Sequence, residues 1–336
     1  MNYLVLKQRI YFVISVLALI VLGSGYGSCT KFSDRLSDSA MVALDSFHHC
    51  QYMAFSRGIG AAGRRSEQLD YANLLRRHTT AEQLVEIANT DTSRITRLWA
   101  YRILLKKADK QVFDILKQAL KDTTHVELMS GCSRFEEPYN RTAISVYRYD
   151  GNELKLPNQL RFSLDSLIFF GYMKNKGFEN GLLMDFKPHK IYYATVIEEA
   201  DKGNYAILPL LAQYKNPNDR QRINKLLKAL LKEDGICSYE ACDAISNWND
   251  PAFEWYAKAA CQATIKQEYY YADEVLQLLC AYPAPWSYQI LKEMLTQKGD
   301  YSNSDTAKDY LTERYKTHPI PPIFKPLYDK YMMKKM

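Results

Sequence analysis

The sequence lacks the short motifs that mark common catalytic and phosphate-binding sites. It contains no Gly-x-Ser-x-Gly elbow, no His-Glu-x-x-His motif and no phosphate-binding P-loop. Its seven cysteines and six histidines show none of the spacings that are typical of zinc sites. We therefore predict no catalytic residue, no metal site and no cofactor, and the sequence by itself names no reaction.

A strong excess of one charge is also missing. The chain has 44 basic and 38 acidic residues and a net charge of +6, which is far from the footprint of a nucleic-acid-binding protein. The acidic pairs Glu136-Glu137 and Glu198-Glu199 have no sequence context that would place two acids in one cleft, so we interpret them as solvated faces. Nucleic acid is not expected as a partner.

The only long uncharged apolar run belongs to the first 29 residues. Lys7 and Arg9 precede an apolar stretch from Ile10 to Leu22, and small residues follow it, which is the order of parts in a secretory signal peptide. The stretch is short for a membrane span, which needs roughly 20 apolar residues. We predict that the protein is exported. Ordinary cleavage would give a secreted or periplasmic protein, and an uncleaved segment would be a single-pass anchor; both are alternatives to the lipid attachment described next.

The end of this segment, Gly27-Ser28-Cys29, resembles the lipobox of bacterial lipoproteins, in which the cysteine carries lipid and becomes the new N-terminus. The small residues before Cys29 fit that pattern, whereas Tyr26 stands where the family has an aliphatic residue. The resemblance implies lipid attachment at Cys29 and a membrane-anchored protein on the periplasmic or surface side of a bacterial cell envelope. Residues 30–37 would then be a polar tether.

Amphipathic helix is the dominant pattern after the tether. A first helix is expected at residues 38–47, and Thr80 with Gln83 forms a capping box at the start of another. Further helices are predicted from about Ser93 to Lys107 and from Val112 to Leu120, and similar hairpins recur between residues 193 and 316. The pattern predicts a mostly all-α fold.

Residues 91–121 resemble a HEAT repeat, a helical hairpin with Arg, Ala and Leu in its first helix. Arg97, Ala100 and Leu104 fit those places, although the usual Asp/Asn-Pro start is missing. The resemblance implies an α-solenoid in which Ala100 lets helices approach closely and Arg97 ties the turn of a neighbouring repeat. We predict an N-terminal repeat block at residues 38–131 and a C-terminal repeat block at residues 163–331.

A segment with strand propensity interrupts this pattern between residues 132 and 162. Residues 142–149 are rich in β-branched and aromatic side chains, Asp150-Gly151 is a turn signal, and residues 153–156 can return as a second strand. We predict a small β-hairpin or loop insertion near residues 140–157.

The glycine motif Gly58-Ile-Gly60-Ala-Ala-Gly63 has the spacing of a dinucleotide-binding fingerprint, but no alternating βα pattern follows it. It is read more simply as a loop before a helix that starts near Ser66. A third interpretation is a loop that binds an anion or a partner's carboxylate, in which the three glycines are flanked by Arg57, Arg64 and Arg65.

The cysteines and histidines allow two further interpretations. His48-His49-Cys50 is a cluster of metal-ligand residue types, but adjacent side chains point in different directions and cannot readily share an ion. In an exported chain, Cys237 with Cys242 or Cys261 with Cys280 could form disulfides. Buried thiols are the alternative.

Tyrosine is unusually frequent, with 26 Tyr against 13 Phe and 4 Trp. Such rings suit half-exposed helix seams, and also glycan or peptide surfaces; clusters occur at Tyr192-Tyr193, Tyr269–Tyr271, and Trp286 with Tyr288. Two functions therefore remain open. One is an envelope-anchored scaffold that holds a protein or peptide partner, and the other is an envelope glycan-binding protein or hydrolase with its site in the Tyr-rich helices or the insertion.

Overall fold

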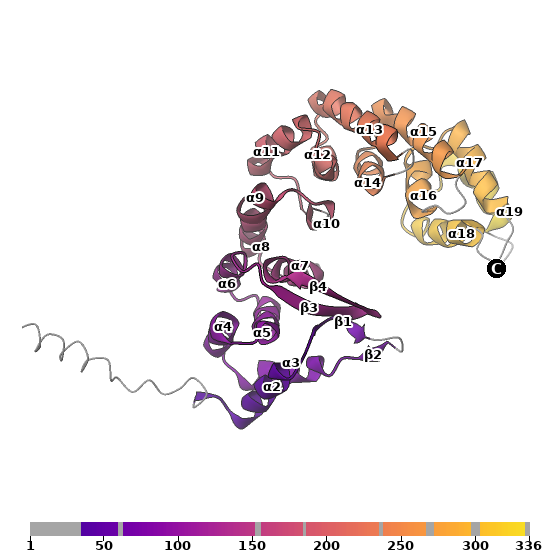
Figure 1. Ribbon diagram of the computed structural model, residues 1–336. Helices are drawn as coiled ribbons and strands as arrows, with labels where there is room; N and C mark the ends of the chain where they lie inside the picture. The colour runs from indigo at the N-terminus through magenta and orange to yellow at the C-terminus, as the bar shows by residue number, and fades with distance from the viewer. Residues whose placement is uncertain are drawn as a thin grey trace, which may run out of the picture. The chain divides into compact units, whose positions relative to one another are not determined.

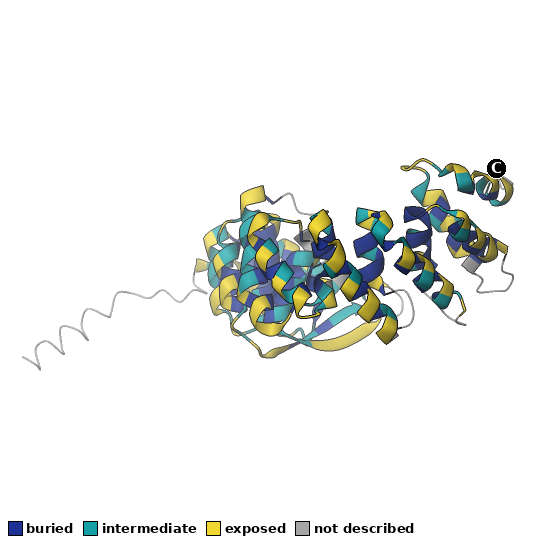
Figure 2. Cartoon of the chain, turned by 90° about the horizontal axis from the view of Figure 1, so that it is seen from above, coloured by how far each residue is buried: buried dark blue, intermediate teal, exposed yellow. Residues whose placement is uncertain are grey.

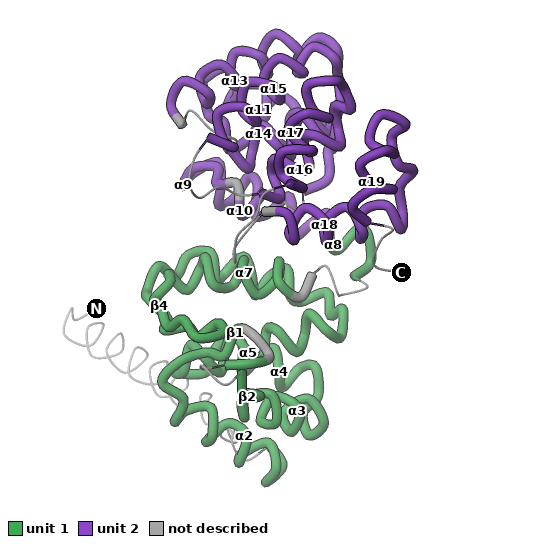
Figure 3. The backbone as a smooth tube through the Cα atoms, turned by 90° about the vertical axis from the view of Figure 1, so that its right-hand side faces the viewer, with its two compact units in different colours: residues 1–160 green, residues 161–336 purple. Residues whose placement is uncertain are grey.

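The computed structural model describes residues 35–59, 63–151, 156–183, 186–234, 238–266, 272–296 and 303–332. The chain divides into two compact units, residues 1–160 and residues 161–336 (Figure 3). The predicted signal peptide, Cys29 and most of the tether lie outside the described residues. Within the described ranges, no helix combines the length and apolar character needed to cross a bilayer. The described chain is mostly helical, as predicted, with one small sheet (Figure 1).

Unit 1 (residues 1–160) contains the sheet and its covering helices. Its elements are α2 (Asp38–His48), β1 (Met53–Ile59), β2 (Arg64–Arg65), α3 (Gln68–His78), α4 (Ala81–Thr90), α5 (Arg94–Lys106), α6 (Val112–Ala119), β3 (His125–Gly131), β4 (Ser133–Pro138) and α7 (Tyr139–Gly151).

The sheet has the strand order β2-β1-β3-β4. The central strands β1 and β3 are parallel, with Met53 opposite Leu128, and the two outer pairs are antiparallel. A parallel pair needs a crossover connection, and helices α3 to α6 supply it between β1 and β3.

Local capping interactions explain where the helices of unit 1 begin. Ser37 accepts a hydrogen bond from the Ala40 amide, and Thr80 and Gln83 make both bonds of the predicted capping box. Ser93 caps α5, so the predicted starts of these helices are confirmed. The buried residues follow the faces that the helices turn towards their neighbours (Figure 2).

The hairpin predicted near residues 140–157 is wrong. Residues 142–149 belong to helix α7, and the strands of the real hairpin are β3 and β4, which turn at Gly131-Cys132. Within α7, Ala143, Ile144, Val146 and Tyr147 are buried at helical spacing, and the helix packs on α5. This burial outweighs the strand propensity of Ile, Val and Tyr; residues 152–155 lie outside the described residues.

Unit 2 (residues 161–336) is helical in its described parts, and the unit boundary falls within α8. Its elements are α8 (Asn158–Ser166), the π-helix η2 (Leu167–Met173), α9 (Lys174–Lys176), α10 (Asn180–Leu183), α11 (Lys190–Asp201), η3 (Tyr205–Ile207), α12 (Leu208–Gln213), η4 (Pro217–Asp219), α13 (Arg220–Asp234), α14 (Tyr239–Trp248), η5 (Pro251–Phe253), α15 (Glu254–Thr264), α16 (Ala272–Ala281), α17 (Pro285–Thr296), α18 (Asn303–Arg314), η6 (Pro322–Phe324) and α19 (Lys325–Tyr331).

The helices of unit 2 form two alternating rows. Helices α12, α14, α16 and α18 pack in sequence along one row, and α11, α13, α15 and α17 pack along the other (Figure 1). Each hairpin therefore contributes one helix to each row and contacts the hairpin before and after it.

A 34-residue period, which the sequence interpretation missed, accompanies this packing. Pro217, Pro251 and Pro285 follow one another at intervals of 34 residues, and each lies in the first turn of a helical segment. An aromatic residue, Tyr214, Trp248 or Tyr282, stands three positions before each proline. Two of these tyrosines donate their hydroxyl hydrogens to backbone carbonyls: Tyr214 to His189, at the start of α11 in the same hairpin, and Tyr282 to Ile245, on α14 of the preceding hairpin.

Candidate functional site

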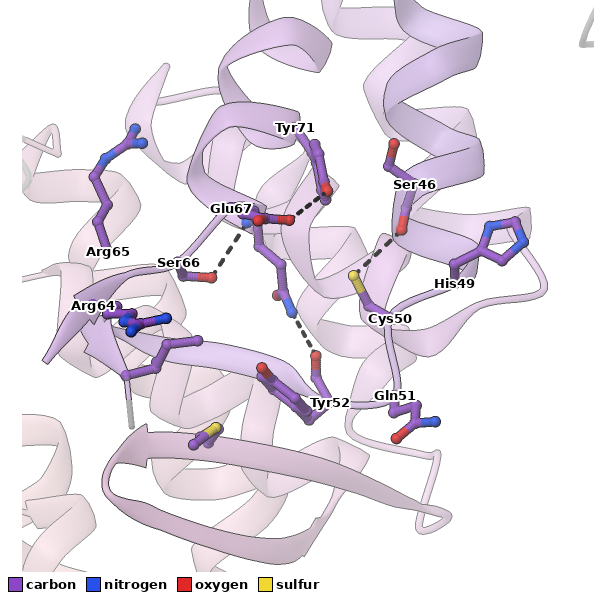
Figure 4. Close-up of a pocket in the computed structure, with 13 residues that line it drawn as sticks. Ser46, His49, Cys50, Gln51, Tyr52, Arg64, Arg65, Ser66, Glu67 and Tyr71 are labelled. Atoms are coloured by element: carbon purple, nitrogen blue, oxygen red, sulfur yellow. Dashed lines mark hydrogen bonds between the residues drawn. The ribbon is translucent and has the colours of Figure 1, made fainter. Parts of the chain in front are cut away.

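A cavity of about 630 Å³ in unit 1 brings the predicted arginine loop next to helices α2 and α3 (Figure 4). Its walls come from the end of α2, the turn into β1, the β1–β2 hairpin, the start of α3 and Met129 of β3. Segments that are far apart in the sequence meet here because β1 pairs with both β2 and β3.

The glycines shape the hairpin that brings the arginines to this cavity. Gly58 pairs with Arg65, and Ile59 pairs with Arg64. Gly63 has φ +57°, and a Cβ on Gly58 would lie 3.0 Å from the Gly63 carbonyl oxygen, so both positions favour glycine. The motif thus joins two antiparallel strands rather than opening a helix, and it has no dinucleotide-binding geometry. Gly60 and the Arg57 side chain lie outside the described parts.

The two described arginines have different environments. The Arg65 guanidinium binds both oxygens of Asp70, at 2.7 and 2.8 Å, and these bonds lower the pKa of Asp70. Arg64 is exposed and lines the cavity. No described carboxylate lies within ion-pair distance of Arg64. The sequence alone could not show that Arg65 is paired with Asp70 and that Arg64 is not paired.

A carboxylate, that of Glu67, lies on the same cavity. Glu67 precedes α3 and accepts a hydrogen bond of 3.1 Å from the Tyr71 hydroxyl, and this bond raises the pKa of Tyr71. Among the described side chains, no cation pairs with Glu67. Besides Arg65, which is paired with Asp70, the cavity therefore has one guanidinium, that of Arg64, and one carboxylate, that of Glu67, that do not neutralise each other.

A buried amide, that of Gln68, fixes the inner wall. Its Nε2 donates to the Tyr52 carbonyl at 2.7 Å, and its Oε1 accepts from the Ala54 amide and from Trp99 Nε1, both at 2.9 Å. The side chain thereby pairs with the edge of β1 as a neighbouring strand would. Strand β1, helix α3 and helix α5 are held together at this point.

The thiol of Cys50 also lines the cavity. It donates to the Ser46 carbonyl at 3.3 Å, and burial together with the charge of Glu67 raises its pKa. A thiol with a raised pKa is mostly protonated at neutral pH and is a poor nucleophile. The cavity therefore lacks an activated cysteine.

The cluster His48-His49-Cys50 disperses in the structure. His48 Nε2 lies 3.0 Å from the Asp91 carboxylate, and His49 Nδ1 lies 2.8 Å from the Asp45 carbonyl oxygen. In the part of the chain that the structure describes, no three His, Cys, Asp or Glu side chains are grouped as metal ligands.

The Glu67→Gln substitution is expected to speed alkylation of Cys50 by iodoacetamide about two- to threefold at pH 7, because removing the nearby negative charge lowers the thiol pKa and increases the thiolate fraction. Peptide mapping by mass spectrometry measures the rate at each cysteine. Glu82→Gln on α4 is the control and should leave the Cys50 rate unchanged. An equal rate in wild type and Glu67→Gln would contradict the electrostatic assignment.

The HEAT-like residues lie on α5, away from the cavity. Arg97 contacts the Asp122 carboxylate, which follows α6, at 3.2 Å, and its guanidinium stacks 4.6 Å from the ring centre of Tyr139. Ala100 and Leu104 are fully buried. Arg97 thus links α5 to the turn that leads into β3.

Asp122 gives unit 1 a pH-dependent contribution to stability. Burial opposes ionisation, but hydrogen bonds from Thr124 and Arg97 outweigh it, so the pKa of Asp122 is lowered from its ordinary value of 3.8. Because the pKa of Asp122 is lower in the folded protein than in the unfolded chain, its ionised carboxylate stabilises the fold at pH values above the unfolded-state pKa. This contribution is lost as the pH falls through the folded-state pKa. Asp122→Asn should therefore reduce the melting temperature most at pH 7, and the difference from wild type should shrink below about pH 4. Thermal melts at pH 7, 5 and 3 check this; a constant difference would contradict it.

Several aromatic residues singled out in unit 2 take part in packing. Tyr192 is buried against Phe169, with ring centres 4.6 Å apart, while Tyr193 donates to Asp219. Trp286 donates to Glu254, and Tyr269–Tyr271 lie outside the described residues. The sequence interpretation did not select Trp255, which is 38 % exposed.

Of the two cysteine pairs proposed from the sequence, Cys261 with Cys280 lies within the described residues. Cys261 and Cys280 do not form a disulfide; the Cys280 sulfur lies 3.9 Å from the Tyr315 hydroxyl, and the Cys261 sulfur lies 4.0 Å from the Val275 carbonyl oxygen. Cys237 lies outside the described residues.

No family model, curated protein or solved structure matches the chain.

Proposed function

We propose that this protein is an exported, lipid-anchored helical scaffold of the cell envelope whose unit 1 cavity binds a short peptide. The observation that carries the proposal is the pair of opposite charges, Arg64 and Glu67, which both line this cavity and do not neutralise each other. A small number of polar or charged side chains that have no ion-pair partner of their own usually determine which ligand a pocket recognises.

A peptide with free ends matches this pair chemically. A guanidinium binds a carboxylate through two parallel hydrogen bonds, so Arg64 is assigned to the C-terminal carboxylate. Glu67 is assigned to the N-terminal ammonium group, and Ser46, Tyr52 and Gln51 offer polar contacts to the peptide backbone. The cavity volume falls within the usual range of roughly 300–1,000 Å³ for small-ligand sites.

The scaffold part of the proposal rests on unit 2. The two rows of helices and the 34-residue period support an α-solenoid, in which each hairpin buries its apolar face against the next. A period of 34 residues is typical of tetratricopeptide-type units, whereas HEAT units have roughly 40 residues; both stack into solenoids. The lipobox-like Gly27-Ser28-Cys29 supports the anchor, and the mass of the mature N-terminus tests it.

Calorimetric titration with trialanine tests the binding proposal. Free trialanine is expected to bind, whereas the N-acetylated and the C-amidated forms should each bind at least about tenfold more weakly, since each has lost one charge. Arg64→Gln should weaken the free and acetylated peptides, and Glu67→Gln should weaken the free and amidated peptides.

A matched control is Arg76→Gln on α3, which removes an exposed positive charge outside the cavity. It should bind trialanine as the wild type does. If blocking both termini has no effect, or if Arg76→Gln weakens binding as much as Arg64→Gln, the assignment of the cavity to peptide ends is incorrect.

A further inference from the structure

An exposed tryptophan and two lysines line a hollow of about 580 Å³ on helices α13 and α15 of unit 2. The hollow is bounded by Gln221, Asn224, Lys225, Lys228, Ala252 and Trp255. It is separate in sequence and in composition from the unit 1 cavity, and it contains no acidic residue.

The indole of Trp255 is exposed but held in place. Its Nε1 donates to Asn224 Oδ1 at 2.7 Å, across two helices of the same row, and its ring lies edge-on to the buried ring of Tyr256 at 5.8 Å. A ring held by a hydrogen bond at one edge and by packing at another loses little conformational freedom when a ligand stacks on its open face.

The cations of the hollow are available. Lys225 and Lys228 are three residues apart and lie on the same face of α13. Both are exposed, and no carboxylate in the described part of the chain lies within ion-pair distance of either; the Asp201 carboxylate, whose pKa is lowered mainly by Arg222 and also by the charge of Lys225, is bonded to Arg222. Gln221, which lines the same hollow, adds a side-chain amide that can hydrogen-bond to hydroxyl groups.

This combination favours an anionic sugar over the other ligands that a basic aromatic surface attracts. A membrane surface would need several exposed apolar side chains, and Trp255 is the one large exposed apolar side chain recorded on α13 and α15. Nucleic acid would need a larger charge excess than the +6 of the whole chain provides. The apolar face of a sugar ring, its hydroxyls and its acid group match the indole, the amides and the lysines in turn.

We propose that this hollow binds an anionic polysaccharide, with a sugar ring stacked on Trp255 and acid groups paired with Lys225 and Lys228. The proposal is independent of the peptide cavity of unit 1, since the two sites share no residue.

Affinity electrophoresis of the mature chain through gels that contain polygalacturonate, dextran sulfate or neutral dextran tests the proposal. Retardation by at least one anionic polymer and not by dextran is expected; which of the two acts identifies carboxylate or sulfate as the acid group. Trp255→Ala and the double variant K225Q/K228Q should each weaken the binding about tenfold, whereas Trp255→Phe, which keeps a ring, should lose less.

The control for unspecific charge attraction is K117Q/K121Q, with Lys117 on α6 and Lys121 in the turn after it, which removes the same charge from another exposed surface of the chain. The control for loss of an exposed ring is Tyr205→Ala. Circular dichroism checks that each variant is folded. The proposal is overturned if both double variants weaken binding equally, if folded Trp255→Ala binds like the wild type, or if neither anionic polymer retards the protein more than dextran does.

Discussion

Replacing Gln68 with methionine is expected to lower the free energy of unfolding of unit 1 by about 3–5 kcal/mol. Methionine has a similar length but removes three buried hydrogen bonds, and it leaves the Ala54 amide, the Tyr52 carbonyl and Trp99 Nε1 without their partner. Each buried polar group left unpaired costs about 1–3 kcal/mol. Gln68→Glu should not rescue the fold at pH 7, because its carboxylate would be a buried unpaired charge with one oxygen against the Tyr52 carbonyl oxygen, two acceptors with no proton between them.

Hydrogen exchange followed by mass spectrometry measures this effect in each unit of the chain. Peptides from β1, α3 and α5 should exchange faster in Gln68→Met, whereas peptides from unit 2 serve as an internal reference. Gln118→Met on α6 is the matched control, since Gln118 is exposed and its recorded side-chain bond is to Lys121; it should change stability by about 0.5 kcal/mol or less. A Gln68→Met protein with wild-type exchange in unit 1 would show that this amide does not hold the sheet to its helices.

The helices could be predicted because their determinants are local. Ser37, Thr80 and Ser93 mark helix starts by capping interactions within three residues of themselves, and the apolar spacing marks the buried faces. Those signals lie within short stretches of the sequence, so the mostly helical character and several helix boundaries follow from them.

The sheet could not be predicted in the same way, since its pairing is long-range. Strand β1 pairs with β3, and helices α3 to α6 lie between the two strands in the sequence. No residue near Met53 in the sequence indicates that β3 is the partner of β1. Residues 142–149 show the opposite failure, because their local strand propensity is overruled by packing of α7 on α5. Propensity is a weak guide wherever burial against a distant element decides the structure.

The candidate site was predictable in composition but not in geometry. The sequence grouped Arg64 and Arg65 beside the glycines, yet only the fold pairs Arg65 with Asp70 and places Arg64 in the lining of the same cavity as Glu67.

The 34-residue spacing of Pro217, Pro251 and Pro285 was present in the sequence and would have indicated a repeat of fixed length in unit 2.

A second large effect is expected at Asp250, which connects successive hairpins of unit 2. Its carboxylate accepts from the Ala252 amide at the start of η5 and from the Arg220 guanidinium at the junction of η4 and α13. Its carbonyl oxygen accepts from the Tyr282 hydroxyl at the end of α16. The carboxylate is buried, whereas the Arg220 side chain is 47 % exposed, so the cap and the buried position dominate the energetics rather than the ion pair.

Asp250→Ala should therefore destabilise unit 2 by about 2–4 kcal/mol, of which roughly 1 kcal/mol is the lost helix cap. Because stacked hairpins exchange stability with their neighbours, faster hydrogen exchange is expected from α13 through α16, and little change in unit 1. Asp201→Ala is the matched control: Asp201 binds Arg222 but is 58 % exposed, and surface pairs contribute about 0–1 kcal/mol. Acceleration confined to η5 in Asp250→Ala would mean that each hairpin is stable alone, which would contradict the coupled stack on which the solenoid proposal depends.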